Sequence, residues 1–397
     1  MIIHRPEITS VGETVTVSAR VEFETPVTDM PESLWFEFPK EYEDLVTDRA
    51  DAFLSTMLLV AMRHGEKTIK VRGEVSPRFL IGINEYQTAF SIWPIWRFKP
   101  IRIECESLIP TGTENGRDIV MSAFSGGVDS FFTLKSYLPG NDLPKSVQIS
   151  HLLFVHGFDI RLEYPKSFPL LRDVYSAMCD RLGIKLISCR TNCQQFGTRL
   201  NWGLFHGSAL IGAAHAVGRR TAMFHVPSSH SFTSLMPWGS DPGIDYLLST
   251  EATQVIHHGS GFTRTEKTEA IAYWEEVCDK LRVCAFDDST FNCSKCEKCL
   301  RTMMTLDMLG VLERYSTFQG PLTGGLIRSC RYWNRSDFSF AHEILSYAWQ
   351  KKRWDFIANL SYAYIRSRIL QTLRVTRIKL SAAIKRTRVS KPALSRR

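Results

Sequence analysis

The sequence predicts an α/β fold with a doubly wound parallel sheet, preceded by a small α+β domain and followed by a helical basic tail. From Asp118 to about Val255, apolar strand patterns alternate with helical patterns, which is typical of a parallel sheet covered on both faces. Earlier in the chain, apolar and polar residues alternate with period two, and the end of the chain has helical spacing among many arginines. We therefore expect three parts, residues 1–112, 118–315 and 338–397.

The first part reads as a mixture of strands and helices. Residues 14–23 alternate with period two, and shorter strands are expected at 35–38, 68–71 and 101–104. Helical spacing marks residues 51–62 and 77–90, and the Pro- and Gly-containing segment 110–116 is a candidate linker. This part contains no chemical motif, and it could serve as a substrate lid, a surface for homodimerisation or a platform for a partner.

The second part contains the strand–helix alternation. Strands are expected at 118–124, 151–155, 184–189 and 221–226, and helices at 128–138, 167–182 and 205–217. In sheets of this kind, ligands bind beyond the carboxyl ends of the strands. The loops that begin at Ser125, His156, Arg190 and Pro227 are therefore the expected site.

Composition and charge limit the class of protein. The chain has 397 residues and a net charge of +8, but residues 366–397 hold 11 Lys or Arg and no acid, which leaves the rest near neutral at −3 (8 minus 11). No apolar stretch near the N-terminus resembles a signal peptide, and no apolar run approaches the ~18 residues of a membrane span. With ten cysteines and no secretory signal, we expect a cytoplasmic protein whose thiols bind metal or stay reduced.

The segment Ser125-Gly-Gly-Val-Asp-Ser130 is the most informative motif. A strand pattern precedes it and a helical pattern follows, the arrangement that directs backbone N–H groups at an anion. Paired glycines let the backbone approach phosphate oxygens, and two serine hydroxyls add donors. Neither a Walker A loop nor a G-x-G-x-x-G motif is present, so phosphate chemistry depends on this loop alone. A chance Gly-Gly turn is the alternative.

Four cysteines near residue 290 have the spacing C-x8-C-x2-C-x2-C. Cys284, Cys293, Cys296 and Cys299 suit one tetrahedral Zn²⁺, and four thiolates would leave no open position for catalysis. An iron–sulfur cluster and a chance group of buried cysteines are the alternatives. The spacing therefore predicts a structural metal.

Together, the loop and the cysteines resemble the 7-cyano-7-deazaguanine synthase family of PP-loop ATP pyrophosphatases, over residues 118–312. The resemblance implies an adenine nucleotide alpha hydrolase-like fold and a reaction of a carboxylate, ATP and ammonia with Mg²⁺. It implies structural zinc at the four cysteines, and pyrophosphate and Mg²⁺ contacts from Ser125, Gly126, Gly127, Val128, Asp129 and Ser130. The segment around Lys267 looks like the family's late lysine-containing segment, so Lys267 is a candidate contact to phosphate or substrate. More than a hundred residues precede the loop, so we expect a divergent, extended member.

Other residues are candidates by position. His230 follows an apolar strand and could be a base or substrate contact, although a surface loop histidine is equally expected. Asp159 follows the second strand and could reach the ribose or a metal, or simply cap a loop. His257 and His258 could form a metal pair, but a rim loop is favoured. Sulfur transfer would need an active cysteine outside the four-cysteine group, for which only Cys189 or Cys193 is well placed; Cys189 is more typical of a core residue.

The leading functional expectation is an ATP-dependent ligase. It would adenylate a small carboxylate, releasing pyrophosphate, and then form an amide or nitrile with an amine or ammonia; a deazapurine is one candidate substrate. The alternatives are sulfur transfer to a nucleic-acid base and a non-catalytic, nucleotide-binding scaffold. The basic tail could bind nucleic acid or an anionic membrane surface, or dock on its own protein.

Overall fold

The computed structural model describes residues 1–93, 98–112, 116–164, 166–284 and 291–389; for 375 and 377–389 it describes the backbone alone. The chain divides into two compact units, Met1–Phe291 and Asn292–Arg397. These units do not follow the divisions expected from the sequence, because residues 1–112 belong to the same unit as the strand–helix alternation. Each unit is described by itself below.

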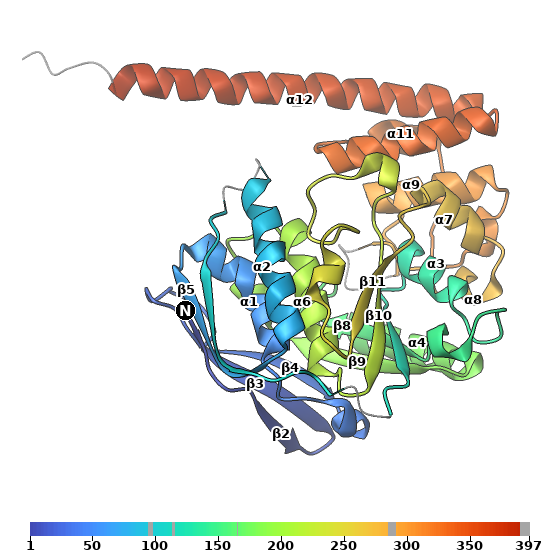
Figure 1. The fold of residues 1–397 in the computed structure, drawn as a ribbon. Helices are drawn as coiled ribbons and strands as arrows, with labels where there is room; N and C mark the ends of the chain where they lie inside the picture. The colour runs from blue at the N-terminus through green and yellow to red at the C-terminus, as the bar shows by residue number, and fades with distance from the viewer. Residues whose placement is uncertain (94–97, 113–115, 165, 285–290, 390–397) are drawn as a thin grey trace, which may run out of the picture. The chain divides into compact units, whose positions relative to one another are not determined.

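The first unit is built on an eleven-stranded mixed sheet (Figure 1). Its strands are β1 (Ile2–Ile3), β2 (Glu7–Val11), β3 (Thr14–Glu22), β4 (Ser33–Pro39), β5 (Thr68–Val75), β6 (Arg102–Leu108), β7 (Ile119–Ala123), β8 (His151–His156), β9 (Lys185–Thr191), β10 (Thr221–Pro227) and β11 (Gln254–His258). The order is β11-β10-β7-β8-β9-β4-β3-β1-β5-β6, with β2 beside β3. The predicted α/β class is confirmed.

The five strands from β7 to β11 pair in parallel with every neighbour among themselves. The sheet as a whole is mixed, because β4 pairs antiparallel with β9: Phe36 lies opposite Thr191 and Glu37 opposite Arg190. Through this pairing the N-terminal strands extend the parallel part of the sheet. The sequence predicted a separate small N-terminal domain, but the sheet continues without a break from the N-terminal strands into the parallel strands.

Helices cover both faces of the parallel strands. The helices of this unit are α1 (Asp51–His64), α2 (Pro77–Ile92), α3 (Val128–Ser136), α4 (Ser167–Leu182), α5 (Cys193–Phe196), α6 (Trp202–Ala216), α7 (Arg264–Ile271) and α8 (Glu275–Cys278). Figure 1 shows α3 and α4 on one side of these strands and α6, with α1 and α2, on the other. This is the two-faced cover that the strand–helix alternation predicts.

Close contact between α1 and α6 ties the N-terminal segment to the parallel strands. The Ser55 hydroxyl donates to the Ser208 carbonyl at 2.8 Å. A Cβ atom at Gly212 would lie 2.3 Å from Thr56 Oγ1, so only glycine permits this approach. One continuous apolar core runs from Met1 to Val255. This shared core explains why residues 1–112 do not form a separate compact unit.

The second unit is helical and has its own apolar core. Its helices are α9 (Glu297–Met308), α10 (Gly324–Ser329), α11 (Arg335–Gln350) and α12 (Trp354–Val389). The Asn334 side chain and Asp337 form a capping box at the start of α11, which fixes where this helix begins. Among the residues whose placement is described, no helix has both the length and the apolar character of a membrane span.

Candidate functional site

The site expected from the sequence lies where the order of the parallel strands reverses. From β7, the chain continues to β8 and β9 on one side of the sheet, and then crosses to β10 and β11 on the other. The loops after β7 and β10 therefore leave neighbouring strands in different directions, and a crevice for ligands forms at such a point. The Ser125–Ser130 loop and the Ser228–Ser231 loop are these two segments.

The loop after β7 has the backbone geometry that its glycines permit. Gly126 has a φ of +74°, and a Cβ atom there would lie 1.8 Å from the Tyr175 hydroxyl oxygen. Gly127 is extended and is the residue from which α3 begins. The Arg282 N–H donates to the Gly126 carbonyl at 2.7 Å, which fixes the loop from outside. The first N–H groups of α3 are thereby held at the rim of the sheet, where they suit an anion.

The two serines of this loop differ in exposure. Ser125 is exposed, so its hydroxyl is accessible to a ligand. Its Oγ accepts a hydrogen bond from the Gly127 N–H at 3.4 Å. Ser130 is buried, and its hydroxyl donates to the Gly127 carbonyl at 2.9 Å. Val128 is also buried in the first turn of α3. Ser130 and Val128 therefore shape the loop in this structure, whereas Ser125 is exposed.

Asp129 meets two cations that come from α7. Its carboxylate forms an ion pair with the Arg264 guanidinium, and its Oδ1 lies 3.5 Å from the Lys267 ammonium group. Helix α7 is placed by a capping box in which the Thr263 and Glu266 side chains bond to each other's backbone N–H groups. Asp129 and Arg264 are 135 residues apart in the sequence, so the fold brings the late lysine-containing helix to the Ser125–Ser130 loop.

Lys267 also joins this group to the loop after β10. The side chain is buried, and its ammonium group donates to the Ser228 carbonyl at 2.6 Å. Ser228 is fixed in turn: its N–H donates to the His258 carbonyl and its hydroxyl to the His230 carbonyl. Asp129, Lys267, Ser228 and His230 therefore form a continuous chain of contacts across the switch point.

A group of aromatic and titratable side chains lies next along this chain of contacts. The ring of Trp238 is 5.6 Å from that of His230 and 5.8 Å from that of His206. His206 lies in the first turns of α6, and burial lowers the pKa of its imidazole, which favours the neutral ring. A neutral imidazole beside an indole suits a flat ligand rather than a cation.

A buried Asp–His pair follows a little further on. The Asp245 carboxylate lies 2.7 Å from His257 Nδ1 and also accepts a hydrogen bond from the Ser240 hydroxyl at 2.6 Å. A carboxylate at Nδ1 fixes the tautomer and orientation of an imidazole, as in catalytic His–Asp pairs. The sequence did not indicate this pair, because its members lie on different elements, η4 (Asp245–Leu248) and β11.

The two adjacent histidines of β11 do not form a metal pair. His257 bonds to Asp245, whereas His258 Nδ1 lies 3.0 Å from the Thr133 hydroxyl of α3. Successive residues of a strand point to opposite faces of the sheet, so these rings are separated by the sheet itself. The expected rim loop at 257–258 is instead the end of a strand. The segment Gln254–His258 has no period-two alternation, so its sequence did not indicate a strand.

Asp159 and the two cysteines Cys189 and Cys193 differ in their access to solvent. Asp159 is exposed in the turn after β8, at the carboxyl edge of the sheet. Cys189 and Cys193 are fully buried, and burial raises the pKa of the Cys189 thiol and raises that of Cys193 to about 12. Both thiols are therefore protonated at neutral pH and inaccessible, which is the core role that the sequence favoured for Cys189.

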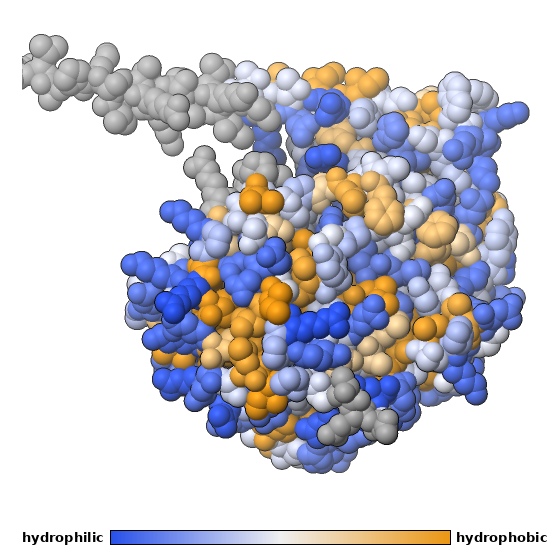
Figure 2. Space-filling view, viewed as in Figure 1, coloured by the Kyte–Doolittle hydropathy of each residue, from blue (hydrophilic) through white to orange (hydrophobic). Residues whose placement is uncertain are grey.

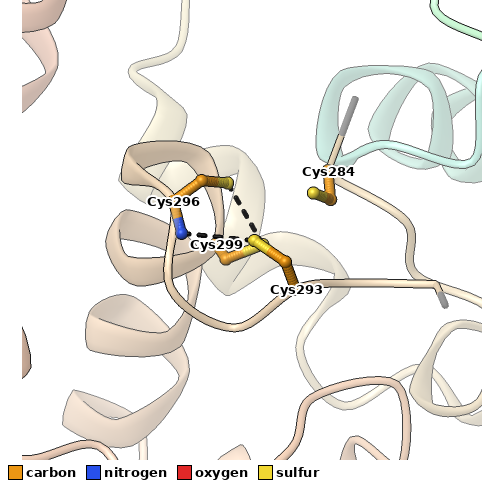
Figure 3. A group of neighbouring side chains, drawn as sticks. All are labelled: Cys284, Cys293, Cys296 and Cys299. Carbon is orange, nitrogen blue, oxygen red and sulfur yellow. Dashed lines mark hydrogen bonds between the residues drawn. The ribbon is translucent and has the colours of Figure 1, made fainter. Parts of the chain in front are cut away.

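The four-cysteine group is present as a cluster (Figure 3). The sulfur atoms of Cys284, Cys293, Cys296 and Cys299 all lie within 4.8 Å of one another. Cys299 Sγ is 3.5 Å from Cys296 Sγ and 3.9 Å from Cys293 Sγ. Tetrahedral zinc with Zn–S bonds of about 2.3 Å places its sulfurs about 3.8 Å apart, so these separations fit. The group could hold a metal ion such as zinc.

Local backbone conformation forms this cluster. Ser294 adopts a left-handed φ of 56°, and the turn lets the Cys296 N–H donate to Cys293 Sγ at 3.3 Å. Cys296 precedes α9, and Cys299 lies in its first turn. N–H donation to sulfur stabilises thiolates. None of the ten cysteines is in a disulfide in this structure.

A separate cavity of about 720 Å³ lies at the junction of the N-terminal strands with β9. Its lining includes His156 at the end of β8, Phe168 of α4 and the ion pair between Arg190 and Glu37. The His156 ring stacks on Phe168 and bonds to the Arg161 carbonyl, so it supports the wall. None of the Ser125–Ser130 loop lines this cavity.

Comparison of the chain with models of protein families, with curated proteins and with solved structures found no match.

Proposed function

We propose that the chain is an ATP-dependent carbon–nitrogen ligase that forms AMP and pyrophosphate. The observation that carries this proposal is the meeting of the Ser125–Ser130 loop with Arg264 and Lys267 at the switch point of the sheet. The loop supplies N–H donors for phosphate oxygens, and the two cations lie beside it. Because no Walker loop is present, the loop is suited to holding a departing pyrophosphate rather than a transferred γ-phosphate.

The roles of the residues follow from their charges. Arg264 and Lys267 would bind the β- and γ-phosphates, and Asp129 would exchange these cations for Mg²⁺, which neutralises phosphate charge. A substrate carboxylate oxygen attacks the α-phosphorus, and the bond from this phosphorus to the bridging oxygen breaks. Pyrophosphate leaves. Ammonia or an amine then attacks the acyl carbon of the adenylate and displaces AMP, losing one proton. Preorganised charge at the loop is the main source of stabilisation.

Recognition of the carboxylate substrate would fall to the group next to the loop. Trp238 offers a flat apolar face, with the ring of His206, whose pKa is lowered by burial, at 5.8 Å and the ring of His230 at 5.6 Å. The pair of His257 and Asp245 could accept the proton that the attacking amine loses. A planar heterocyclic carboxylate, of which a deazapurine is one, suits this lining.

Sulfur transfer is less well supported. It requires an accessible thiol of low pKa outside the metal cluster, and burial gives Cys189 and Cys193 the opposite properties. A non-catalytic scaffold would bind ATP at the same loop without converting it. Release of AMP and pyrophosphate would therefore distinguish the ligase from the scaffold.

The test is to incubate the chain with Mg²⁺, ATP and candidate carboxylates, and to identify the nucleotide released. AMP with pyrophosphate is expected. Asp129→Asn and Lys267→Met should each lower AMP formation by at least about 100-fold, because charge at the reacting phosphates is lost. Asp118→Asn is the matched control, since Asp118 is an exposed carboxylate paired with Arg220 just before β7. Release of ADP, or unchanged AMP formation by a folded Asp129→Asn variant, would contradict the proposal.

A further inference from the structure

Helix α12 carries apolar residues on two opposite sides. Phe356, Leu360 and Ala363 are buried in the core of the helical unit, where α12 packs against α10 and α11. A second set of residues lies on the other side and is exposed to solvent. This stripe consists of Trp354, Ala358, Tyr362, Ile365, Ile369 and Leu373. A helix that only docks on its own protein needs the first set and not the second.

The stripe is regular along the helix. Its members follow one another at intervals of four, four, three, four and four residues, so they fall within about 100° of the helix circumference. From Trp354 to Leu373 it extends about 28 Å along the axis, at 1.5 Å per residue. The side chains are well exposed, with Trp354 at 59%, Ile369 at 56% and Leu373 at 62%. Elsewhere, as Figure 2 shows for one face, apolar areas are separated by hydrophilic ones.

Charge identifies what could cover the stripe. No acid occurs from Phe356 to Arg397, and residues 366–397 contain 11 Lys or Arg. Arg366 and Arg368 fall on either side of the stripe by their helical spacing. The Arg368 guanidinium lies over the Phe338 ring and Arg366 donates to the Cys330 carbonyl, so contacts within the helical unit hold both cations beside the stripe. An apolar stripe between cations, with tryptophan at one end, is the pattern of a helix that lies in the surface of an anionic bilayer.

Two other occupants fit less well. Nucleic acid would satisfy the cations through its phosphates, but it would leave six apolar side chains in water. A second copy of the helix would cover the apolar stripe, but side by side in parallel it would bring the 11 positive charges of residues 366–397 against 11 more, with no acid after Asp355 to offset them. We propose that α12 binds an anionic lipid surface, with the stripe from Trp354 to Leu373 inserted among the acyl chains and the flanking cations at the headgroups.

Sedimentation with vesicles tests this proposal. The full chain should bind vesicles of phosphatidylcholine mixed with phosphatidylglycerol, and bind pure phosphatidylcholine at least about tenfold more weakly. The triple variant Ile365→Ser, Ile369→Ser and Leu373→Ser keeps every charge and should lose at least about tenfold in its partition onto the mixed vesicles. The matched control replaces three other exposed apolar residues, Val11→Ser, Ile81→Ser and Ile92→Ser, and should bind like the unchanged chain.

Three results would overturn the proposal. The chain could show no preference for anionic vesicles, or the triple variant could bind them as well as the unchanged chain. Labelled RNA or DNA could displace the vesicles and bind the triple variant with unchanged affinity, which would assign the tail to nucleic acid. Light scattering could give twice the chain mass for the unchanged protein and the single mass for the triple variant, which would assign the stripe to a second copy. Circular dichroism of each variant verifies that α12 remains helical.

Discussion

Lys267 illustrates how a single buried charge defines the candidate site. A buried ammonium group is costly unless it is paired and hydrogen-bonded, and Lys267 has both the Ser228 carbonyl and the Asp129 carboxylate within reach. These contacts satisfy the cation while they hold two loops together. An incoming phosphate could replace Asp129 as the counter-charge without leaving Lys267 unpaired. The same residue therefore stabilises the free protein and is ready to bind an anion.

The cysteine cluster leads to a prediction at the scale of single residues. Metal analysis should find about one zinc per chain, and Cys296→Ser should lose it, because four thiolates are needed to close the tetrahedral site. The variant should unfold at a lower temperature, as should the unchanged chain treated with a chelator, since metal-binding energy is folding energy. Cys278→Ser, which changes a half-buried cysteine outside the cluster, is the control and should keep its zinc. A visible iron–sulfur absorption band would contradict the zinc assignment.

At the scale of elements, local sequence patterns predicted where strands and helices lie, but they did not predict which strands pair. The expected strand at 118–124 is β7, and the helix expected after the glycines is α3, because apolar periodicity and the turn residues agree there. Residues 14–23, 35–38, 68–71 and 101–104 likewise correspond to strands of the structure. The antiparallel pairing of β4 with β9 could not be read from the sequence, because no local pattern records which distant strand lies alongside.

The candidate site likewise has one part that the sequence predicted and one part that it did not. The loop, its serines and Lys267 were found because each belongs to a motif that is continuous in sequence. His206, Trp238 and the pair of Asp245 with His257 were not brought together by sequence reasoning. Their elements meet only after the β9–α6–β10 crossover has formed, so their proximity is a property of the sheet order.

Strand β10 carries a prediction about pH. His225 is fully buried, neither ring nitrogen has a hydrogen-bond partner among the described residues, and burial followed by the charge of His258 lowers its pKa to about 4. The unfolded chain binds a proton there near pH 6.5, whereas the folded chain does not until about pH 4. The free energy of unfolding therefore decreases as the pH falls from 6.5 towards 4, by up to about 1.4 kcal/mol per pH unit for this group.

Replacing the group checks that reasoning. His225→Leu should flatten the pH dependence of the urea unfolding midpoint between these values, and it should leave stability at neutral pH equal or higher because an unsatisfied polar ring is removed. His342→Leu changes an exposed histidine and should leave the slope as it is. An unchanged slope in His225→Leu would show that the imidazole is protonated in the folded chain.

At the scale of the whole molecule, residues 1–112 and the strand–helix alternation share one sheet and one core. Phe36 of β4 is fully buried, lies 5.6 Å from the ring of Phe53 in α1, and sits opposite Thr191 of β9. Glu37 adds an ion pair with Arg190 across the same strands. The N-terminal segment therefore covers an edge of the parallel sheet. Without it, the edge strand could pair with strands of other chains, and exposed edge strands promote aggregation.

The dependence of the fold on this junction can be measured in the full chain. Phe36→Asp places an unpaired carboxylate in the shared core and should lower the free energy of unfolding by at least about 3 kcal/mol, because both packing and charge burial are unfavourable. Val11→Asp, at a β2 position that is 76% exposed, should change it by less than about 0.5 kcal/mol. A chain that lacks residues 1–112 should aggregate, since β9 loses its neighbour and the core facing α1 is uncovered. If that shortened chain were instead a folded monomer that binds ATP, the first 112 residues would be an independent domain and the shared core would not be required for folding.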